Sequence, residues 1–291
     1  MPFVLSPFEY LEPKTAEEAI RFLSDYNKRA KVLAGGVDLV DRMRRRDIGP
    51  EYVVSLRSIP GLDRVEGNET KGLRIGALVT LRSVERCATI RRHYVSLWEA
   101  VHQIASMQVK TMGTMVGNLC VATPASDVAV ALLALGAELR ILDPAGERIV
   151  PIENFFVGVH QTILQPSEIV VEVLLPSLPP ATAGAFMNLV RTAADISKVS
   201  TAVTLTAASN ICKDIRIAVG AVAPTVVRAK QAEGTLKEQK LEQKLIEAAA
   251  EAAAREVRPI TDIRSTAEYR KETTKVLVRR TIEKAWERLN A

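Results

Sequence analysis

Cysteine is scarce in this sequence: Cys87, Cys120 and Cys212 are the only three among 291 residues, and no two of them form a CxxC pair. An iron–sulfur cluster or an all-cysteine zinc site needs four thiolates, so this chain alone is expected to hold neither. A disulfide framework is not expected in a chain of this size either. The three histidines are scattered, with no HxxxH or HExxH spacing, and we interpret them as core or surface residues.

Long apolar runs and aromatic residues are also lacking. No apolar run reaches the roughly 18 to 20 residues that a membrane span needs, and the starting sequence MPFVLSPFEYLEP lacks the basic start and cleavage site of a signal peptide. We therefore expect a cytoplasmic protein. The net charge is +5 and aromatics are 4%. The one dense basic run, DRMRRRD at 41–47, has no interleaved aromatics, so we interpret it as a solvated helix face or a partner contact rather than a nucleic-acid site.

The first part of the chain alternates between helical and strand-like periodicity. Expected helices cover residues 15–26, 38–46, 81–106 and 125–136, and expected strands cover residues 32–35, 51–59, 73–80, 137–142, 148–151 and 168–176. Thr15 is the expected N-cap of the first helix, with Glu18 as its capping-box partner. The opening order of strand, glycine turn, helix and strand indicates an α/β unit.

The C-terminal part combines a sheet with helices. Expected strands cover residues 183–190, 201–209 and 214–224, and expected helices cover residues 238–257 and 266–289. The stretch SLPPATAG before them is rich in proline and small residues, which is typical of a boundary. We predict an α+β protein with units at residues 1–57, 58–178 and 179–291.

Two glycine loops stand out, VLAGGVDL at 32–39 and MGTMVGN at 112–118. Gly113 and Gly117 favour positive φ and are poor helix interiors, so the second stretch is predicted to be a loop. Consecutive N–H groups of such turns can form a phosphate-binding nest, although ordinary turns explain most glycine pairs. Neither loop is a GxGxxG fingerprint or a GxxxxGK[ST] P-loop, which excludes Rossmann and NTPase interpretations.

Both loops resemble those of one protein family. AGGVD at 34–38 is similar to an AGG motif followed by Thr or His and then Ser or Asp, and MGTMVGN is similar to MGTIGGN. AVGAVAPTVVRAKQAE and RSTAEYRKETTKVLVRRTIEKA resemble two further segments of the same family, in the same order. The family is the FAD-binding medium subunit of molybdenum hydroxylases, which includes carbon monoxide dehydrogenase flavoproteins and the flavin domain of xanthine dehydrogenase.

The resemblance implies a p-cresol methylhydroxylase-type FAD-binding fold of two α/β subdomains, followed by a carbon monoxide dehydrogenase flavoprotein-like C-terminal α+β domain. The residues that it assigns to FAD are Val32, Leu33, Ala34, Gly35, Gly36, Val37, Asp38 and Leu39 in the first loop, Thr114, Met115, Val116, Gly117 and Asn118 in the second, and Asp127, Ile169, Val170 and Met187 beyond them. On this view the glycines leave the backbone bare so that it can approach two phosphates.

Some of these residues have another interpretation. Asp127 could be the N-cap of the helix that follows it, instead of or as well as a cofactor ligand. Thr114 could be a turn residue, and Asn118 could bond within its own loop.

The sequence departs from the family pattern at three positions. Val116 replaces a glycine, and a β-branched residue at positive φ would be strained, so either its backbone is in an allowed region or the loop is reshaped. Val37 replaces a hydroxyl or histidine side chain, and Met187 stands where xanthine dehydrogenase has a lysine near the flavin.

The resemblance also implies a function. This chain would carry FAD and no metal, and none of its residues would be catalytic towards the organic substrate. A large subunit would hold molybdopterin and a small subunit two [2Fe–2S] clusters, in a dimer of heterotrimers. Electrons would pass through FAD to an external acceptor. A flavin-free assembly subunit and a free-standing flavin oxidoreductase of the same fold are the alternatives, and the substrate and acceptor stay open.

Overall fold

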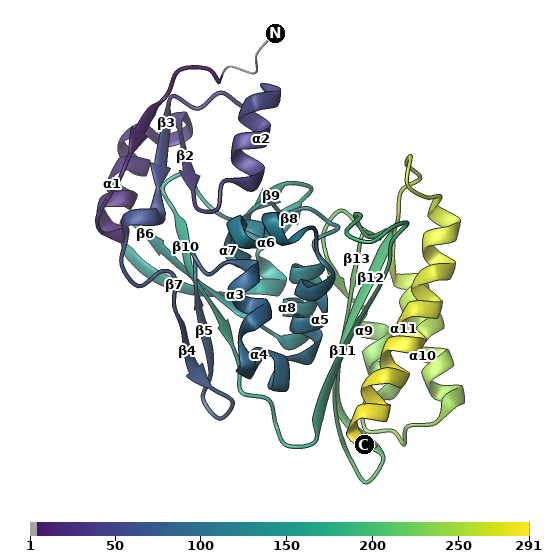
Figure 1. Ribbon diagram of the computed structural model, residues 1–291. Helices are drawn as coiled ribbons and strands as arrows, with labels where there is room; N and C mark the ends of the chain where they lie inside the picture. Colours follow the sequence, from purple (N-terminus) through teal and green to yellow (C-terminus); the bar gives the residue numbers. More distant parts are fainter. Residues whose placement is uncertain (1–4, 291) are drawn as a thin grey trace.

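The first of three main β-sheets belongs to the N-terminal part of this computed structural model, which describes residues 5–290 (Figure 1). It is parallel, with the order β1-β3-β2. Its elements are β1 (Glu9–Leu11), α1 (Ala16–Tyr26), η1 (Asn27–Arg29), β2 (Ala30–Leu33), α2 (Val37–Arg45), β3 (Tyr52–Ser55) and η2 (Leu56–Ser58). The α/β unit expected from the sequence is therefore present, with the short strand β1 in addition.

Helix α1 begins where the sequence predicts. Thr15 Oγ1 accepts a hydrogen bond from the backbone N–H of Glu18 at 3.1 Å, which satisfies one of the first amides of the helix. The reciprocal bond differs from a capping box, because the Glu18 carboxylate accepts from the N–H of Lys14 at 2.8 Å. Ala19, Ile20 and Leu23 are buried on one face of the helix, against the sheet.

The second sheet has five antiparallel strands in the order β4-β5-β10-β6-β7. Its strands are β4 (Val65–Asn68), β5 (Gly72–Gly76), β6 (Glu138–Asp143), β7 (Gly146–Pro151) and β10 (Ile169–Leu175); η3 (Ile152–Asn154), β8 (Phe156–Gly158) and β9 (Gln161–Thr162) lie between β7 and β10. Six helices follow β5: α3 (Leu81–Arg86), α4 (Ala88–His93), α5 (Val95–Gln103), α6 (Met107–Met112), α7 (Met115–Cys120) and α8 (Asp127–Leu135). All nine residues of α8 are buried, which agrees with the apolar residues that follow Asp127 on every face of the helix.

The prediction of one long helix at residues 81–106 is wrong. The structure has three short helices there, which break at Cys87 and at Tyr94. Tyr94 is 1% exposed, and its hydroxyl donates to the carbonyl oxygen of Pro176 at 2.9 Å. The helical pattern of the sequence continues through Tyr94, but the helix breaks where the Tyr94 ring is buried and its hydroxyl is bonded just after the end of β10.

The third sheet is antiparallel, with the order β11-β12-β13-β14. Its strands are β11 (Thr182–Leu189), β12 (Val199–Ala208), β13 (Ile211–Gly220) and β14 (Val227–Arg228), and the helices after them are α9 (Lys230–Leu236), α10 (Gln243–Glu256) and α11 (Ala267–Asn290). These helices cover one face of the sheet, while α5 and α8 pack against the other (Figure 1). No helix in the described part of the chain is long and apolar enough to cross a membrane.

One carboxylate joins the C-terminal helix to the middle of the chain. Glu99 on α5 accepts hydrogen bonds from Arg288 Nη2 at 2.6 Å, from Lys284 Nζ at 2.7 Å and from the N–H of Phe186 at 2.8 Å. Burial of Glu99 raises its pKa, but these donors outweigh that effect and lower the pKa below its ordinary value. Three elements, α5, β11 and α11, are thus tied at one point.

Candidate functional site

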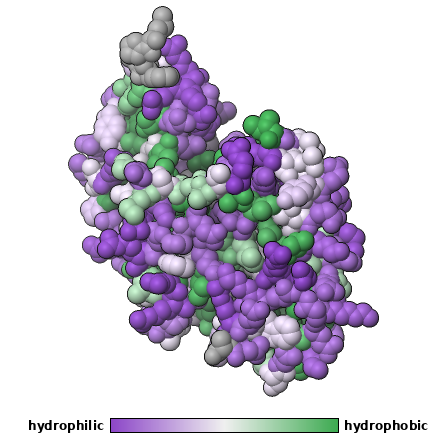
Figure 2. Space-filling model, turned by 45° about the vertical axis from the view of Figure 1, so that its right-hand side comes forward, coloured by the Kyte–Doolittle hydropathy of each residue, from purple (hydrophilic) through white to green (hydrophobic). Residues whose placement is uncertain are grey.

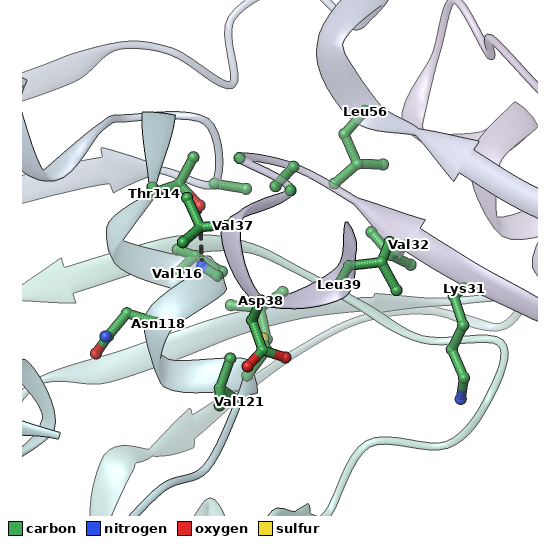
Figure 3. Close-up of a pocket in the computed structure, with 18 of the residues that line it drawn as sticks. Lys31, Val32, Val37, Asp38, Leu39, Leu56, Thr114, Val116, Asn118 and Val121 are labelled. Atoms are coloured by element: carbon green, nitrogen blue, oxygen red, sulfur yellow. Dashed lines mark hydrogen bonds between the residues drawn. The ribbon is translucent and has the colours of Figure 1, made fainter. Parts of the chain in front are cut away.

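A cleft of about 1090 Å³ opens between the first sheet and the layer of α6 and α7. The β2–α2 loop and the start of α7 both line it, and so do Ile169 and Val170 at the start of β10. Figure 3 shows Val37, Thr114 and Val116 close together where the two loops meet, with Lys31 at the far end of the first loop. The face of the molecule in Figure 2 is mostly hydrophilic, and its apolar patches are small and separate.

The first loop touches the second through backbone atoms. A Cβ added to Gly35 would lie 2.3 Å from the carbonyl oxygen of Met112, a distance that no real side chain tolerates. Gly36 has φ +81° and serves as the N-cap of α2, a left-handed position that favours glycine. Close contact between the loops therefore requires the bare backbone at Gly35, a reason different from the predicted approach to phosphate.

The second stretch is not the predicted glycine loop. Residues Met115–Cys120 form helix α7, and neither Gly113 nor Gly117 has positive φ. Thr114 is the N-cap of this helix, and its Oγ1 accepts from the N–H of Gly117 at 3.0 Å. A Cβ on Gly117 would lie 2.8 Å from that same oxygen, closer than real Cβ atoms come, so with the Thr114 side chain in this position the cap fits a glycine.

Val116 causes no strain. It lies in the first turn of α7, outside the set of described residues with positive φ, and its side chain is 4% exposed in the core. The first of the two possibilities for this residue, an allowed backbone region, is the one that the structure has. Asn118 does not bond only within its loop, because its Oδ1 accepts from Ser126 Oγ at 2.6 Å.

A buried ion pair supports the second loop from behind. Lys110 in α6 is 6% exposed, and its Nζ donates to Glu85 at 2.7 Å and to the carbonyl oxygen of His102 at 3.1 Å. Arg82 and His102 also bond to the Glu85 carboxylate, at 2.7 Å and 2.8 Å. Burial raises the pKa of Glu85, but the bonds from Lys110, Arg82 and His102 outweigh it and lower the pKa to about 2. Glu85 is therefore ionised and fixes the end of α6.

Most of the residues predicted to contact a cofactor line the cleft. They are Val32, Ala34, Gly35, Gly36, Val37, Asp38, Leu39, Thr114, Val116, Gly117, Asn118, Ile169 and Val170. Leu33 and Met115 are instead buried in the two adjoining cores, and Met187 packs partly buried against the core of the third sheet. Asp127 also lies outside the lining.

One interpretation predicted Asp127 as the N-cap of α8, and it is wrong. Ser126 is the cap, and its Oγ accepts from the N–H of Ala129 at 3.1 Å. The Asp127 carboxylate accepts from Ser197 Oγ at 2.9 Å and from Asn188 Nδ2 at 3.1 Å. Burial raises the pKa of Asp127 to about 6, against the opposite effect of these two bonds. The described contacts of this carboxylate therefore run to the C-terminal half of the chain.

Other lining residues were not found from the sequence. Lys28 and Lys31 bring two exposed positive charges to the cleft, and the place of Lys31 in a strand beside the first loop was an available signal. His160 lies in the turn between β8 and β9, and its Nδ1 is 2.8 Å from the carbonyl oxygen of Val121. Nothing in the sequence places this scattered histidine beside the second loop.

The chemistry of the lining suits an extended, anionic and partly apolar cofactor. Ligand pockets commonly measure about 300 to 1,000 Å³, so this cleft has room for a dinucleotide. The N-terminus of α2 and the two lysines favour phosphate, while Ile169 and Val170 give an apolar wall. Among residues 5–290, no group of three or more His, Cys, Asp or Glu side chains is arranged to hold a metal ion. FAD fits this set of residues.

Comparison with known proteins agrees with this fold and with an FAD cofactor. The family described as FAD binding domain in molybdopterin dehydrogenase matches residues 6–178, and the CO dehydrogenase flavoprotein C-terminal domain matches residues 184–285. The chain belongs to the family of FAD-binding medium subunits of molybdenum hydroxylases. Its cofactor is FAD, and it is a subunit of an oxidoreductase.

Similarity to individual relatives extends over almost the whole chain. The carbon monoxide dehydrogenase medium chain of Hydrogenophaga pseudoflava is 31% identical, over 97% of this chain and 98% of its own length. The nicotine 6-hydroxylase medium subunit of Paenarthrobacter nicotinovorans is 32% identical, over 97% of this chain and 98% of its own length. A solved structure of the H. pseudoflava enzyme, in a form lacking the Mo-pyranopterin moiety, superposes with a TM-score of 0.95 at 31% identity, over 98% of this chain and 99% of that chain. The predicted fold is confirmed.

Proposed function

We propose that this chain passes electrons from the iron–sulfur clusters of a partner subunit to an external acceptor, by way of FAD held in the cleft between the two loops. The observation that supports this most directly is that the 34–38 loop and the 114–118 segment, far apart in the sequence, line one cleft in a chain of this family. FAD supplies the redox chemistry when it is bound, and the protein binds and orients it and tunes its surroundings.

The residues that line the cleft suggest which part of FAD each of them would contact. The amides of Gly35 and Gly36 and the N-terminus of α2 would bind the pyrophosphate, and Lys28 and Lys31 would offset its charge. The apolar side chains of Ile169 and Val170 would exclude water from part of the cofactor. Leu33, Met115, Asp127 and Met187 stay predictions of cofactor contacts, because they lie outside the lining.

We further propose the quaternary arrangement that the resemblance implies. A large subunit with molybdopterin would carry out the reaction on the substrate, and a small subunit with two [2Fe–2S] clusters would deliver electrons to this chain, in a cytoplasmic dimer of heterotrimers. Relatives named as medium chains or subunits support a multi-subunit assembly. We also propose three structural units at residues 1–57, 58–178 and 179–291. The presence of one main sheet in each of these ranges supports this division.

The flavin-free alternative rested on Val116 alone. Because Val116 is helical and unstrained, no observation now favours it over an FAD-binding subunit.

The test is an absorption spectrum of the purified chain, with identification of any cofactor that denaturation releases. We expect the bands of oxidised flavin and release of FAD, or uptake of added FAD by cofactor-free protein. A colourless chain that takes up no FAD, alone and when co-purified with its partners, would contradict the proposal.

The partner assignment needs a separate measurement. The chain, tagged and purified from its native host, is expected to bring with it one iron–sulfur subunit and one molybdenum-containing subunit in equal amounts. A chain that purifies alone with bound FAD and reacts directly with a substrate would favour the free-standing oxidoreductase instead.

A further inference from the structure

Arg57 holds the first loop through two backbone carbonyls. Its Nε donates to the carbonyl oxygen of Ala34 and its Nη2 donates to that of Gly35, each at 3.1 Å. Arg57 lies in η2, directly after β3, and its N–H is capped by Ser55 Oγ at 3.4 Å. The backbone of Arg57 is therefore held at the end of β3, the strand next to β2, and Arg57 itself is not among the residues that line the cleft.

These two bonds also determine the direction of two amide groups. In a trans peptide unit the C=O and the N–H point in opposite directions, and no peptide bond of residues 5–290 is cis. The carbonyls of Ala34 and Gly35 share their peptide units with the N–H groups of Gly35 and Gly36. Fixing both oxygens towards Arg57 therefore turns both N–H groups away from it.

The two amides are available for a ligand. Gly35 and Gly36 both line the cleft, and neither N–H donates to an acceptor within the described chain. Glycine rotates easily about its backbone bonds, so this loop has little conformational preference of its own. With the peptide units reversed, two carbonyl oxygens would face the cleft and repel an anion. The forked guanidinium selects the arrangement in which two hydrogen-bond donors are presented together.

We propose that Arg57 is a positioning residue that orients the amides of Gly35 and Gly36 for the pyrophosphate group of FAD, without lining the cleft itself. The proposal rests on the proposed function, since it assumes that FAD occupies this cleft. The fork matters more than the charge, because one guanidinium plane makes two bonds that a lysine ammonium on a flexible stem cannot reproduce with the same geometry.

The test compares the full-length chain with its Arg57→Gln and Arg57→Lys variants. Each is stripped of cofactor and titrated with FAD, and the thermal unfolding temperature is measured without FAD. Arg64, which is exposed and makes no side-chain bond or ion pair within residues 5–290, provides the matched control Arg64→Gln. We expect Arg57→Gln to bind FAD about tenfold more weakly or worse, which is the loss of one to two good hydrogen bonds. Arg57→Lys should stay close to Arg57→Gln, and Arg64→Gln should match the wild type.

A second readout tests whether the effect is at the phosphates. Inorganic pyrophosphate should compete with FAD for the wild-type chain, and Arg57→Gln should weaken this competition by a similar factor to FAD binding. Full recovery in Arg57→Lys, or pyrophosphate competition unchanged in Arg57→Gln, would overturn the positioning role. If the wild type bound no FAD, the proposed function would fail as well, whereas undiminished binding by a folded Arg57→Gln would overturn only the present proposal.

Discussion

The α-carbon of Gly35 faces the carbonyl oxygen of Met112 so closely that a Cβ on Gly35 would lie 2.3 Å from that oxygen. Gly35→Ala is therefore expected to separate the two loops, at an overpacking cost of about 1–3 kcal/mol in the free energy of unfolding, and to weaken FAD binding as well. Gly49→Ala is the matched control, because a Cβ there meets nothing within 4 Å. Unfolding curves and FAD titrations measure both effects, and a Gly35→Ala variant as stable as Gly49→Ala would contradict the predicted collision.

Replacing Val116 by the glycine that is usual in the family should not stabilise the fold. Val116 is helical and 4% exposed, so Val116→Gly removes a packed side chain and adds backbone freedom within α7. We expect a loss of about 2–3 kcal/mol in unfolding free energy, from helix propensity and lost burial together. Chemical denaturation with and without FAD checks this. A Val116→Gly chain more stable than the wild type would show that valine is strained here.

Glu85 should make the protein sensitive to acid. Its pKa is lowered to about 2 from 4.5, so the ionised carboxylate stabilises the fold above about pH 4.5, and this stabilisation is lost as the pH falls towards 2. The shift corresponds to about 3 kcal/mol. We expect Glu85→Gln to be destabilised by roughly that amount at pH 7, with the difference from the wild type shrinking in acid. The exposed Glu287 supplies a control, Glu287→Gln, and equal behaviour of both variants would contradict the role of the Lys110 pair.

The ionisation of Asp127 should change the stability of the fold in the opposite direction from that of Glu85. Burial raises its pKa to about 6 from 3.8, so ionising it destabilises the folded chain above about pH 6, and this cost disappears as the pH falls towards 3.8. Asp127→Asn keeps an acceptor for Ser197 and Asn188 and has no charge to bury. The FAD-free variant is expected to gain up to about 3 kcal/mol in unfolding free energy at pH 8 and little at pH 4. Chemical denaturation of the variant and the wild type at pH 8 and pH 4 measures the difference. A variant that is less stable than the wild type at pH 8 would refute the prediction.

The sequence was sufficient where one local rule acts alone. Thr15 caps α1 and Gly136 ends α8 with φ +69°, both as their residue types require. Gly117 shows the limit, because two glycines indicated a loop, whereas the structure has a helix capped by Thr114 with Gly117 in its first turn. Propensity gave the wrong element there, although Thr114, Val116, Gly117 and Asn118 do line the cleft.

Contacts between distant segments were beyond reach from the sequence. Arg57 acts on a loop 22 residues away through carbonyl oxygens, which leave no trace in residue types. His160 approaches the second loop through a turn 39 residues from Val121. Most of the lining residues could be named because both glycine segments resemble those of one family, but the side chains that fix the backbone there depend on tertiary structure.

The tie between Glu99 and Arg288 has a consequence for biosynthesis. The two residues are 189 positions apart, and the carboxylate that joins the sheet of the C-terminal half to α5 lies in the earlier segment. At about 5–20 residues per second, a ribosome needs roughly 10–40 s to get from one to the other. During that interval the nascent chain holds a carboxylate whose two cationic partners do not yet exist. All residues that line the cleft lie at or before position 170, so they are synthesised before the third sheet that packs against α5 and α8.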